Sequence, residues 1–196
     1  MILTNDIKRE TALPSRIYKV KGVLFMWEIN QKIWGDYMRY KKGVYTALIP
    51  DNVESSLVSE RNWAERRLLE SSEQLGIHVK PGDICFTDFG IAYLNESGFQ
   101  HFGLLISIFQ KKGLMVPMSS NPVTYAKAYD PLNNPEGRRH LMRIGQVKGL
   151  NKPSVLFLND IKFVNTARII DIKAHIDVNS EMFRTIKARV LSVVSG

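Results

Sequence analysis

Residues 79–121 read VKPGDICFTDFGIAYLNESGFQHFGLLISIFQKKGLMVPMSSN and contain three short apolar runs, at 84–89, 102–109 and 114–118. Each run is bounded by Gly, Pro, Asn or Ser and is too short for a typical helix, so each is predicted to be a buried strand. Residues 111–113 are short enough for a hairpin loop between the second and third strands. The stretch therefore predicts a small β-barrel with polar groups at the ends of its strands.

The rest of the chain is expected to complete this barrel or to pack against it. Residues 122–137 are polar and are predicted to form a long loop, which in a compact domain is usually functional or mobile. Residues 138–152, RRHLMRIGQVKGLNK, carry five Lys and Arg and no acid, with a strand expected at 141–144. Residues 154–164 predict a strand with a polar break at Asn159 and Asp160.

The C-terminal residues predict one more strand and a helix. Residues 169–176 alternate, with Ile170, Ile172, Ala174 and Ile176 on one face. Residues 177–180 cap a helix over 181–194. Its predicted apolar stripe is Met182, Ile186, Val190 and Val193.

The N-terminal part has a different pattern. Residues 21–42 predict a helix by the spacing of their apolar residues, and residues 44–49 predict a short strand or a connector. A turn is expected at 50–52, followed by a second helix over 55–75 that ends at Gly76. Trp63, Leu68 and Leu69 would be its buried side. This helix would pack on the barrel, pair with a second copy or bind a partner.

Composition narrows the class of protein. The chain has 196 residues and is 44% hydrophobic, which suits one domain or a small domain with an extension. No apolar run is long enough to cross a membrane, and no signal peptide is recognised. The single cysteine, Cys85, lies in an apolar strand and is expected to be a buried small hydrophobe. These features predict a soluble cytoplasmic protein.

The positive charge is unevenly distributed. The net charge is +8, and residues 79–196 contribute 15 Lys and Arg against nine Asp and Glu. A basic surface attracts polyanions, chiefly nucleic acid. Solubility alone would also account for such a balance.

The order of the pieces from residue 79 onward resembles the MazF/PemK (Kid-type) toxin ribonucleases of bacterial toxin–antitoxin pairs. The resemblance rests on PGDICFTDFG, a loop with Glu96 and Gly98, FGLLISI, LMVPMSSN, SVLFLNDIKFVNTARI and the C-terminal helix. It implies a mainly β (α+β) fold: an SH3-like barrel with a C-terminal helix over 79–196. Residues 1–78 would be a mostly helical extension of unknown role.

The resemblance also implies an activity. The family cuts single-stranded RNA without a metal, through attack of the 2′-OH on the adjacent phosphate. Such chemistry needs a base, an acid and groups that hold the charged phosphate. No metal-ligand spacing and no cofactor motif is present in this sequence. The expected partners are single-stranded RNA, a cognate antitoxin and a second copy of the chain, with no membrane.

The family's site residues map onto this chain position by position. An Arg before the second strand and a Thr or Ser after the third correspond to His101 and Ser119, the expected catalytic pair. His101 is titratable where a fixed cation is usual, so Arg143, or Arg138 and Arg139, would supply that charge. The remaining expected substrate-binding residues are Glu96, Gln100, Ser120, Asn121 and Asn159. Asn159 stands where one branch of the family has an acid, so any acid–base role there would pass to Asp160.

Two other functions are compatible with the same sequence. One is a noncatalytic nucleic-acid-binding module, in which the missing Arg marks lost activity. The other is a protein-binding poison similar to the CcdB-type toxins, which share the barrel and bind DNA gyrase. A nuclease needs both His101 and Ser119, whereas a gyrase-binding protein needs neither.

Overall fold

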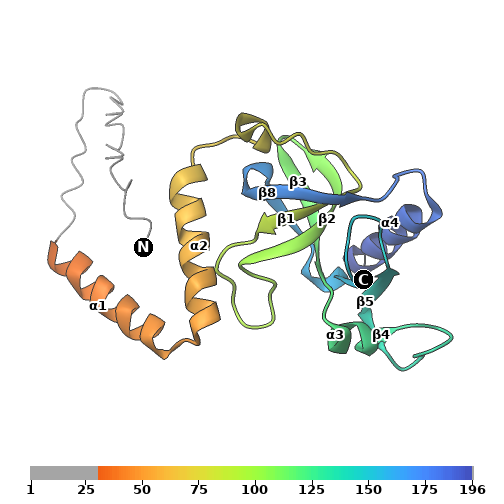
Figure 1. The fold of residues 1–196 in the computed structure, drawn as a ribbon, viewed down its shortest axis with the longest axis horizontal. Helices are drawn as coiled ribbons and strands as arrows, with labels where there is room; N and C mark the ends of the chain where they lie inside the picture. The colour runs from red at the N-terminus through yellow and green to blue at the C-terminus, as the bar shows by residue number, and fades with distance from the viewer. Residues whose placement is uncertain (1–30, 196) are drawn as a thin grey trace, which may run out of the picture. The chain divides into compact units, whose positions relative to one another are not determined.

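The computed structural model describes residues 31–195 and divides the chain into two units, residues 1–47 and 48–196. The described part of the first unit is helix α1 (Gln31–Ala47), and helix α2 (Pro50–Arg66) begins the second (Figure 1). The first ten residues of the helix expected over 21–42 lie outside the described residues. The prediction of a short strand or connector at 44–49 is wrong for residues 44–47, which belong to α1. Context easily overrides the β propensity of such residues.

Helix α2 differs from the helix predicted over 55–75. It begins at Pro50, in the stretch predicted to be a turn, because a proline at the first helical position gives up only an N–H that has no partner there. It ends at Arg66, and a separate 3₁₀ helix, η1 (Ser72–Leu75), follows and ends at Gly76 with φ of 73°. The glycine was correctly predicted as a terminator, but of a shorter helix.

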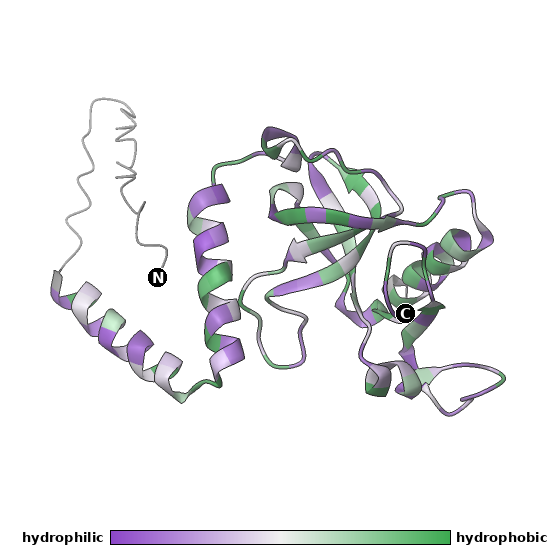
Figure 2. Ribbon diagram, in the orientation of Figure 1, coloured by the Kyte–Doolittle hydropathy of each residue, from purple (hydrophilic) through white to green (hydrophobic). Residues whose placement is uncertain are grey.

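The buried face of α2 also differs from the prediction. Its buried residues are Ser56 and Ser59, whereas Trp63 is 64% exposed. Leu68 and Leu69 lie beyond the end of the helix, where Leu68 is 72% exposed and Leu69 is half-buried. Figure 2 shows α2 as mostly hydrophilic, in contrast to the strands of the sheet. The helix therefore contacts the sheet through small polar side chains and hydrogen bonds, and its largest apolar side chain remains in solvent.

Among the described residues the sheet contains eight strands. Their order is β4-β5-β6-β3-β2-β1-β8, with β7 paired to β3, and all pairs are antiparallel except β4 with β5. The strands are β1 (Asp83–Asp88), β2 (Gln100–Phe109), β3 (Lys112–Ser119), β4 (Ala128–Tyr129), β5 (Arg138–Gly145), β6 (Ser154–Phe157), β7 (Lys162–Asn165) and β8 (Ile169–His175).

This arrangement confirms a mainly β fold with helices. Among the described residues no pairing joins the end strands β4 and β8, so the expected closure of the barrel is not found. Residues 122–137 are not a plain loop, because they contain the helix α3 (Pro122–Lys127) and β4. Asn121 starts α3 by accepting hydrogen bonds from the backbone N–H of Val123 (2.8 Å) and of Thr124 (3.4 Å).

The central strands are buried on both faces. Ile84, Leu104 and Val116 belong to one core cluster, and their neighbours Cys85, Leu105 and Met115 belong to another. Strands buried on both faces are apolar at successive positions, which explains the unbroken runs in the sequence. Burial raises the pKa of the Cys85 thiol to about 12, so this residue is the buried hydrophobe that was expected.

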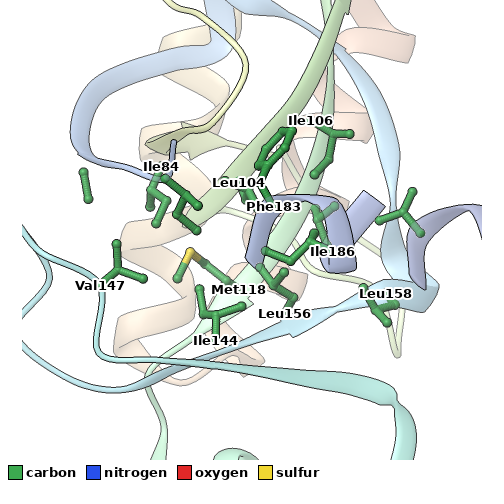
Figure 3. Close-up of a cluster of buried hydrophobic side chains, with 14 residues drawn as sticks. Ile84, Leu104, Ile106, Met118, Ile144, Val147, Leu156, Leu158, Phe183 and Ile186 are labelled. Atoms are coloured by element: carbon green, nitrogen blue, oxygen red, sulfur yellow. The ribbon is translucent and has the colours of Figure 1, made fainter. Parts of the chain in front are cut away.

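Helix α4 (Glu181–Val194) covers the first cluster (Figures 1 and 3). Ser180 caps the helix by accepting a hydrogen bond from the N–H of Phe183 at 3.2 Å. The buried face consists of Phe183, Ile186 and Val190. The predicted stripe is thus half right, because Met182 and Val193 are each 41% exposed and Phe183 takes the inward position.

Between β6 and β8 the chain makes two short 3₁₀ helices, η2 (Leu158–Asp160) and η3 (Thr166–Arg168). The first of them, η2, falls at the polar break predicted at Asn159 and Asp160. Asn165 accepts a hydrogen bond from the N–H of Ala167 at 2.8 Å and so starts η3.

Candidate functional site

A cavity of about 400 Å³ lies at the ends of strands β2 and β3. It is lined by Phe102, Met118, Ser119, Ser120, Gly149, Leu150, Asn151, Lys152, Ser154 and Lys173. The walls come from β2, β3, β8 and the turn between β5 and β6. Two of the residues predicted from the sequence, Ser119 and Ser120, are part of it.

The register of the strands explains why a cavity forms there. The β2–β3 ladder has its last pair at Gly103 and Pro117, and beyond it β3 pairs with β6 instead. The two strands therefore separate. The ladder register, if continued, would place His101 opposite Ser119, two residues past that last pair on each strand.

His101 itself stays on the β1 side of this opening. It pairs with Thr87 of β1, its side chain is exposed, and it does not line the cavity. Phe102, the next residue, lines the cavity and packs against the core. The predicted catalytic pair thus lies at the same end of the β2–β3 hairpin, with only Ser119 on the cavity wall.

The lining favours an anionic ligand. It contains two ammonium groups, Lys152 and Lys173, and three serine hydroxyls, and no Asp or Glu lines it. Lys173 forms an ion pair with Asp171 outside the lining, and its hydrogen bond lowers the pKa of that carboxyl. The exposed Lys152 has no ion pair with any residue in the range 31–195. Hydroxyl and ammonium donors without a competing carboxylate suit a phosphate oxygen.

Arg143, one of the predicted phosphate-binding residues, is engaged within the fold. Its guanidinium donates to the carbonyl oxygens of Tyr125 (3.0 Å) and Ala126 (3.3 Å) and lies 3.4 Å from the Asp130 carboxylate. It also lies 4.9 Å from the centre of the Tyr125 ring. Arg143 therefore holds the C-terminal end of α3 in place.

Asp130 is fixed in the same cluster. The backbone N–H groups of Asn133 and Leu132 hold the pKa of its carboxyl below the ordinary value, and Arg143 adds to this effect. Arg138 and Arg139 are exposed at the start of β5 and do not line the cavity. The guanidinium of Arg139 lies 5.3 Å from the centre of the Tyr129 ring.

The remaining predicted residues lie outside the cavity and have other contacts. Glu96 accepts a hydrogen bond from the N–H of Tyr93 at 3.3 Å and so braces the loop between β1 and β2. Asn121 caps α3, and Asn159 is exposed in η2. Gln100 donates to the Ser59 hydroxyl at 2.8 Å, which directs it to α2.

Asp160, the alternative acid, is also engaged. It forms an ion pair with Lys162 at 3.0 Å and accepts a hydrogen bond from the N–H of Ser97 at 2.5 Å. Lys162 donates to the carbonyl oxygen of Ser97 at 3.1 Å. These contacts fasten the loop between β1 and β2 to the rest of the sheet.

Four polar lining residues were missed by the sequence reasoning: Asn151, Lys152, Ser154 and Lys173. The signal for Lys152 was present, since it is the last cation of the acid-free run 138–152. The sequence contains no such signal for Lys173, because the alternating pattern of 169–176 only places it on the outward face of a strand. No helix within residues 31–195 is long and apolar enough to span a membrane, and no cluster of three His, Cys, Asp or Glu suited to a metal occurs there.

Comparison with protein-family models and with curated proteins finds no match. Among solved structures, a MazF from Deinococcus radiodurans is 13% identical, with a TM-score of 0.46 over 61% of this chain and 99% of that one. An endoribonuclease from Mycobacterial species is 9% identical, with a TM-score of 0.41 over 60% and 91%. A mycobacterial endoribonuclease solved with its cognate antitoxin is 10% identical, with a TM-score of 0.42 over 60% and 96%. The chain is thus similar in structure, at low sequence identity, to MazF toxin endoribonucleases.

Proposed function

We propose that this protein is an endoribonuclease that cleaves single-stranded RNA without a metal ion. The observation that supports it best is the cavity beyond the β2–β3 ladder, which offers hydroxyl and ammonium donors and no carboxylate. It lies at the ends of β2 and β3, the two strands that carry the expected catalytic residues His101 and Ser119. An RNA phosphate would meet hydrogen bonds and positive charge there without like-charge repulsion.

The reaction transfers two protons. The 2′-oxygen bonds to phosphorus as its proton passes to a base, and the bond to the 5′-oxygen breaks as an acid protonates that oxygen. The products carry a 2′,3′-cyclic phosphate and a 5′-hydroxyl. In this proposal His101 exchanges one of the protons, Ser119 and Ser120 donate to the phosphate, and Lys152 supplies the fixed charge that Arg143 does not.

The test is incubation of the pure protein with a long single-stranded RNA in EDTA, followed by detection of 2′,3′-cyclic phosphate ends. His101→Ala should lose about 10²–10⁴-fold in rate, as expected for one acid–base group. His78→Ala is the matched control, because His78 is also exposed and lies far along the chain from the cavity. Cleavage by His101→Ala at the full rate, with the fold intact, would remove His101 from the mechanism.

His101→Arg separates two roles for this position. If a fixed charge is required, the Arg variant keeps or gains activity. If proton transfer is required, it fails as the Ala variant does, and the rate of the unaltered protein varies with pH near neutrality.

A noncatalytic nucleic-acid-binding module is the second candidate, favoured by two observations: Arg143 is committed to α3, and His101 stands outside the cavity lining. RNA binding without any cleavage in EDTA or in Mg²⁺ would establish it. Control by a cognate antitoxin and assembly as a homodimer also belong to the proposal for the nuclease. A monomer in light scattering at micromolar concentration would contradict the dimer.

A further inference from the structure

A second cavity, of about 450 Å³, lies where α2 meets the sheet, and it shares no residue with the first. It is lined by Ser59, Glu60, Asn62, Trp63, Arg66, Arg67, Asp88, Phe89, Gly90, Ile91, Asn165, Ala167 and Arg168. Its walls are one face of α2, the end of β1 with the loop that follows, and η3. Figure 1 shows α2 next to the loop between β1 and β2.

One lining residue of this cavity, Asp88, is buried, with an exposed fraction of 3%. Its carboxylate accepts hydrogen bonds from the Ser59 hydroxyl (2.7 Å), the Asn62 amide (2.9 Å), the Gly90 N–H (2.9 Å) and the Gln100 amide (3.3 Å). Four donors satisfy the buried charge and attach α2 to β1. The cavity is therefore built by the fold and is fixed by buried polar contacts.

Three arginines line this cavity: Arg66, Arg67 and Arg168. Arg66 donates to the carbonyl oxygens of Ala167 (3.2 Å) and Ile169 (3.1 Å), and Arg168 donates to the carbonyl oxygen of Asp88 (3.3 Å). Arg67 donates to the carbonyl oxygen of Ala64. Within the described part of the chain none of the three forms an ion pair with a carboxylate. Each retains N–H donors for a ligand, because a guanidinium has five.

Trp63 forms an aromatic wall. It is 64% exposed, and the Arg67 guanidinium lies 5.7 Å from the centre of its ring. An exposed indole beside guanidinium groups matches the combination that binds single nucleotides of a strand, in which the base stacks on the ring and a cation holds the phosphate. The volume is within the range of small-ligand pockets.

We propose that this cavity binds a nucleotide, with the base stacked on Trp63 and the phosphate held by Arg67 and Arg168. A strand of RNA and a free nucleotide present the same chemistry. The site goes beyond the proposed cleavage site, because it is built by α2, which lies outside the resemblance to the nuclease family. It would add a contact to the substrate strand, or respond to a free nucleotide, without taking part in the reaction.

The test measures binding to a strand that cannot be cleaved. The full chain is titrated into a fluorescein-labelled, fully 2′-O-methylated ten-nucleotide RNA at low salt, and anisotropy is recorded. Trp63→Ala should weaken binding about 5- to 100-fold, the size expected for one stacked base, and Trp63→Phe should restore most of it. Arg168→Ala should weaken binding as well and reduce its dependence on salt.

The chain offers matched controls. Trp34→Ala removes another exposed tryptophan, on α1, and Arg61→Ala removes an arginine of α2 that does not line the cavity. Both should bind as the unaltered protein does. Competition by AMP identifies the source of the nucleotide. If AMP displaces the labelled strand from the unaltered protein through Trp63, the site accepts a free nucleotide. If Trp63→Ala weakens binding of the strand but AMP does not displace it, the site accepts only a strand.

Unchanged binding of both ligands to the folded Trp63→Ala variant would overturn the proposal. Circular dichroism checks the fold, and the exposure of Trp63 makes loss of structure an unexpected outcome. Because the strand is uncleavable, this result is independent of whether the protein cuts RNA. A nuclease with an inert α2 cavity and a binding protein with no activity are therefore distinguishable.

Discussion

Asp88 shows how one buried residue connects helix α2 to the sheet. Four donors converge on its carboxylate: two from α2, one from β2 and one from the loop that follows β1. We predict that Asp88→Ala lowers the free energy of unfolding by about 2–4 kcal/mol, because buried donors lose their acceptor. Urea denaturation measures this, with Glu65→Ala as a control that should cost under about 0.5 kcal/mol, since Glu65 is in an exposed pair with Arg61. Equal midpoints for the two variants would refute the role of Asp88.

Cys85 gives a prediction for pH. Burial raises the pKa of its thiol from 9.0 to about 12, so the folded protein keeps the proton where the unfolded chain releases it. This contribution to stability is therefore complete below pH 9 and decreases as the pH rises towards 12. The native protein should resist a thiol-reactive disulfide reagent at pH 8 and react in urea. Rapid labelling of the native protein would show that the thiol is accessible.

At the scale of elements, the buried face of helix α4 differs from the face that the spacing of its apolar residues predicts. Met182 and Phe183 compete for the same place in a helical stripe, and the structure buries Phe183 with Ile186 and Val190. Ile186→Ala should therefore cost about 2–5 kcal/mol in unfolding free energy. Met182→Ala should cost under about 1 kcal/mol, because its side chain is partly exposed. Chemical denaturation of the two variants side by side checks this, and a larger loss for Met182→Ala would contradict the observed face.

At the scale of the whole molecule, the charge of +8 bears on RNA affinity. The logarithm of the affinity should fall linearly with the logarithm of the salt concentration, by about 0.7 per phosphate neutralised in a single strand. Lys152→Ala should flatten that slope by about this amount. Lys187→Ala, an exposed cation of α4, is the matched control that should leave the slope unchanged. Equal slopes for both variants would exclude Lys152 from the interface.

Arg143 shows that a cation in a basic segment need not be available to bind phosphate. The acid-free run 138–152 suggested one phosphate-binding surface, but the structure uses Arg143 to hold α3 and puts only Lys152 on the cavity wall. Composition shows that charge is present on a segment. It does not show which cations have partners within the fold.

The sequence by itself determined the strands β1, β2 and β3, the break between β6 and β7, and the extent of α4. These features depend on local signals, namely apolar runs, turn residues and the Ser180 cap, which act within a few residues. Only the tertiary structure decided that α2 packs through serines, that Lys173 and Lys152 share a cavity with Ser119, and that Trp63 lines another. Those outcomes depend on residues that lie tens of positions apart in the chain. Strand register decides which of them come together, and so do the hydrogen bonds that a buried residue such as Asp88 accepts.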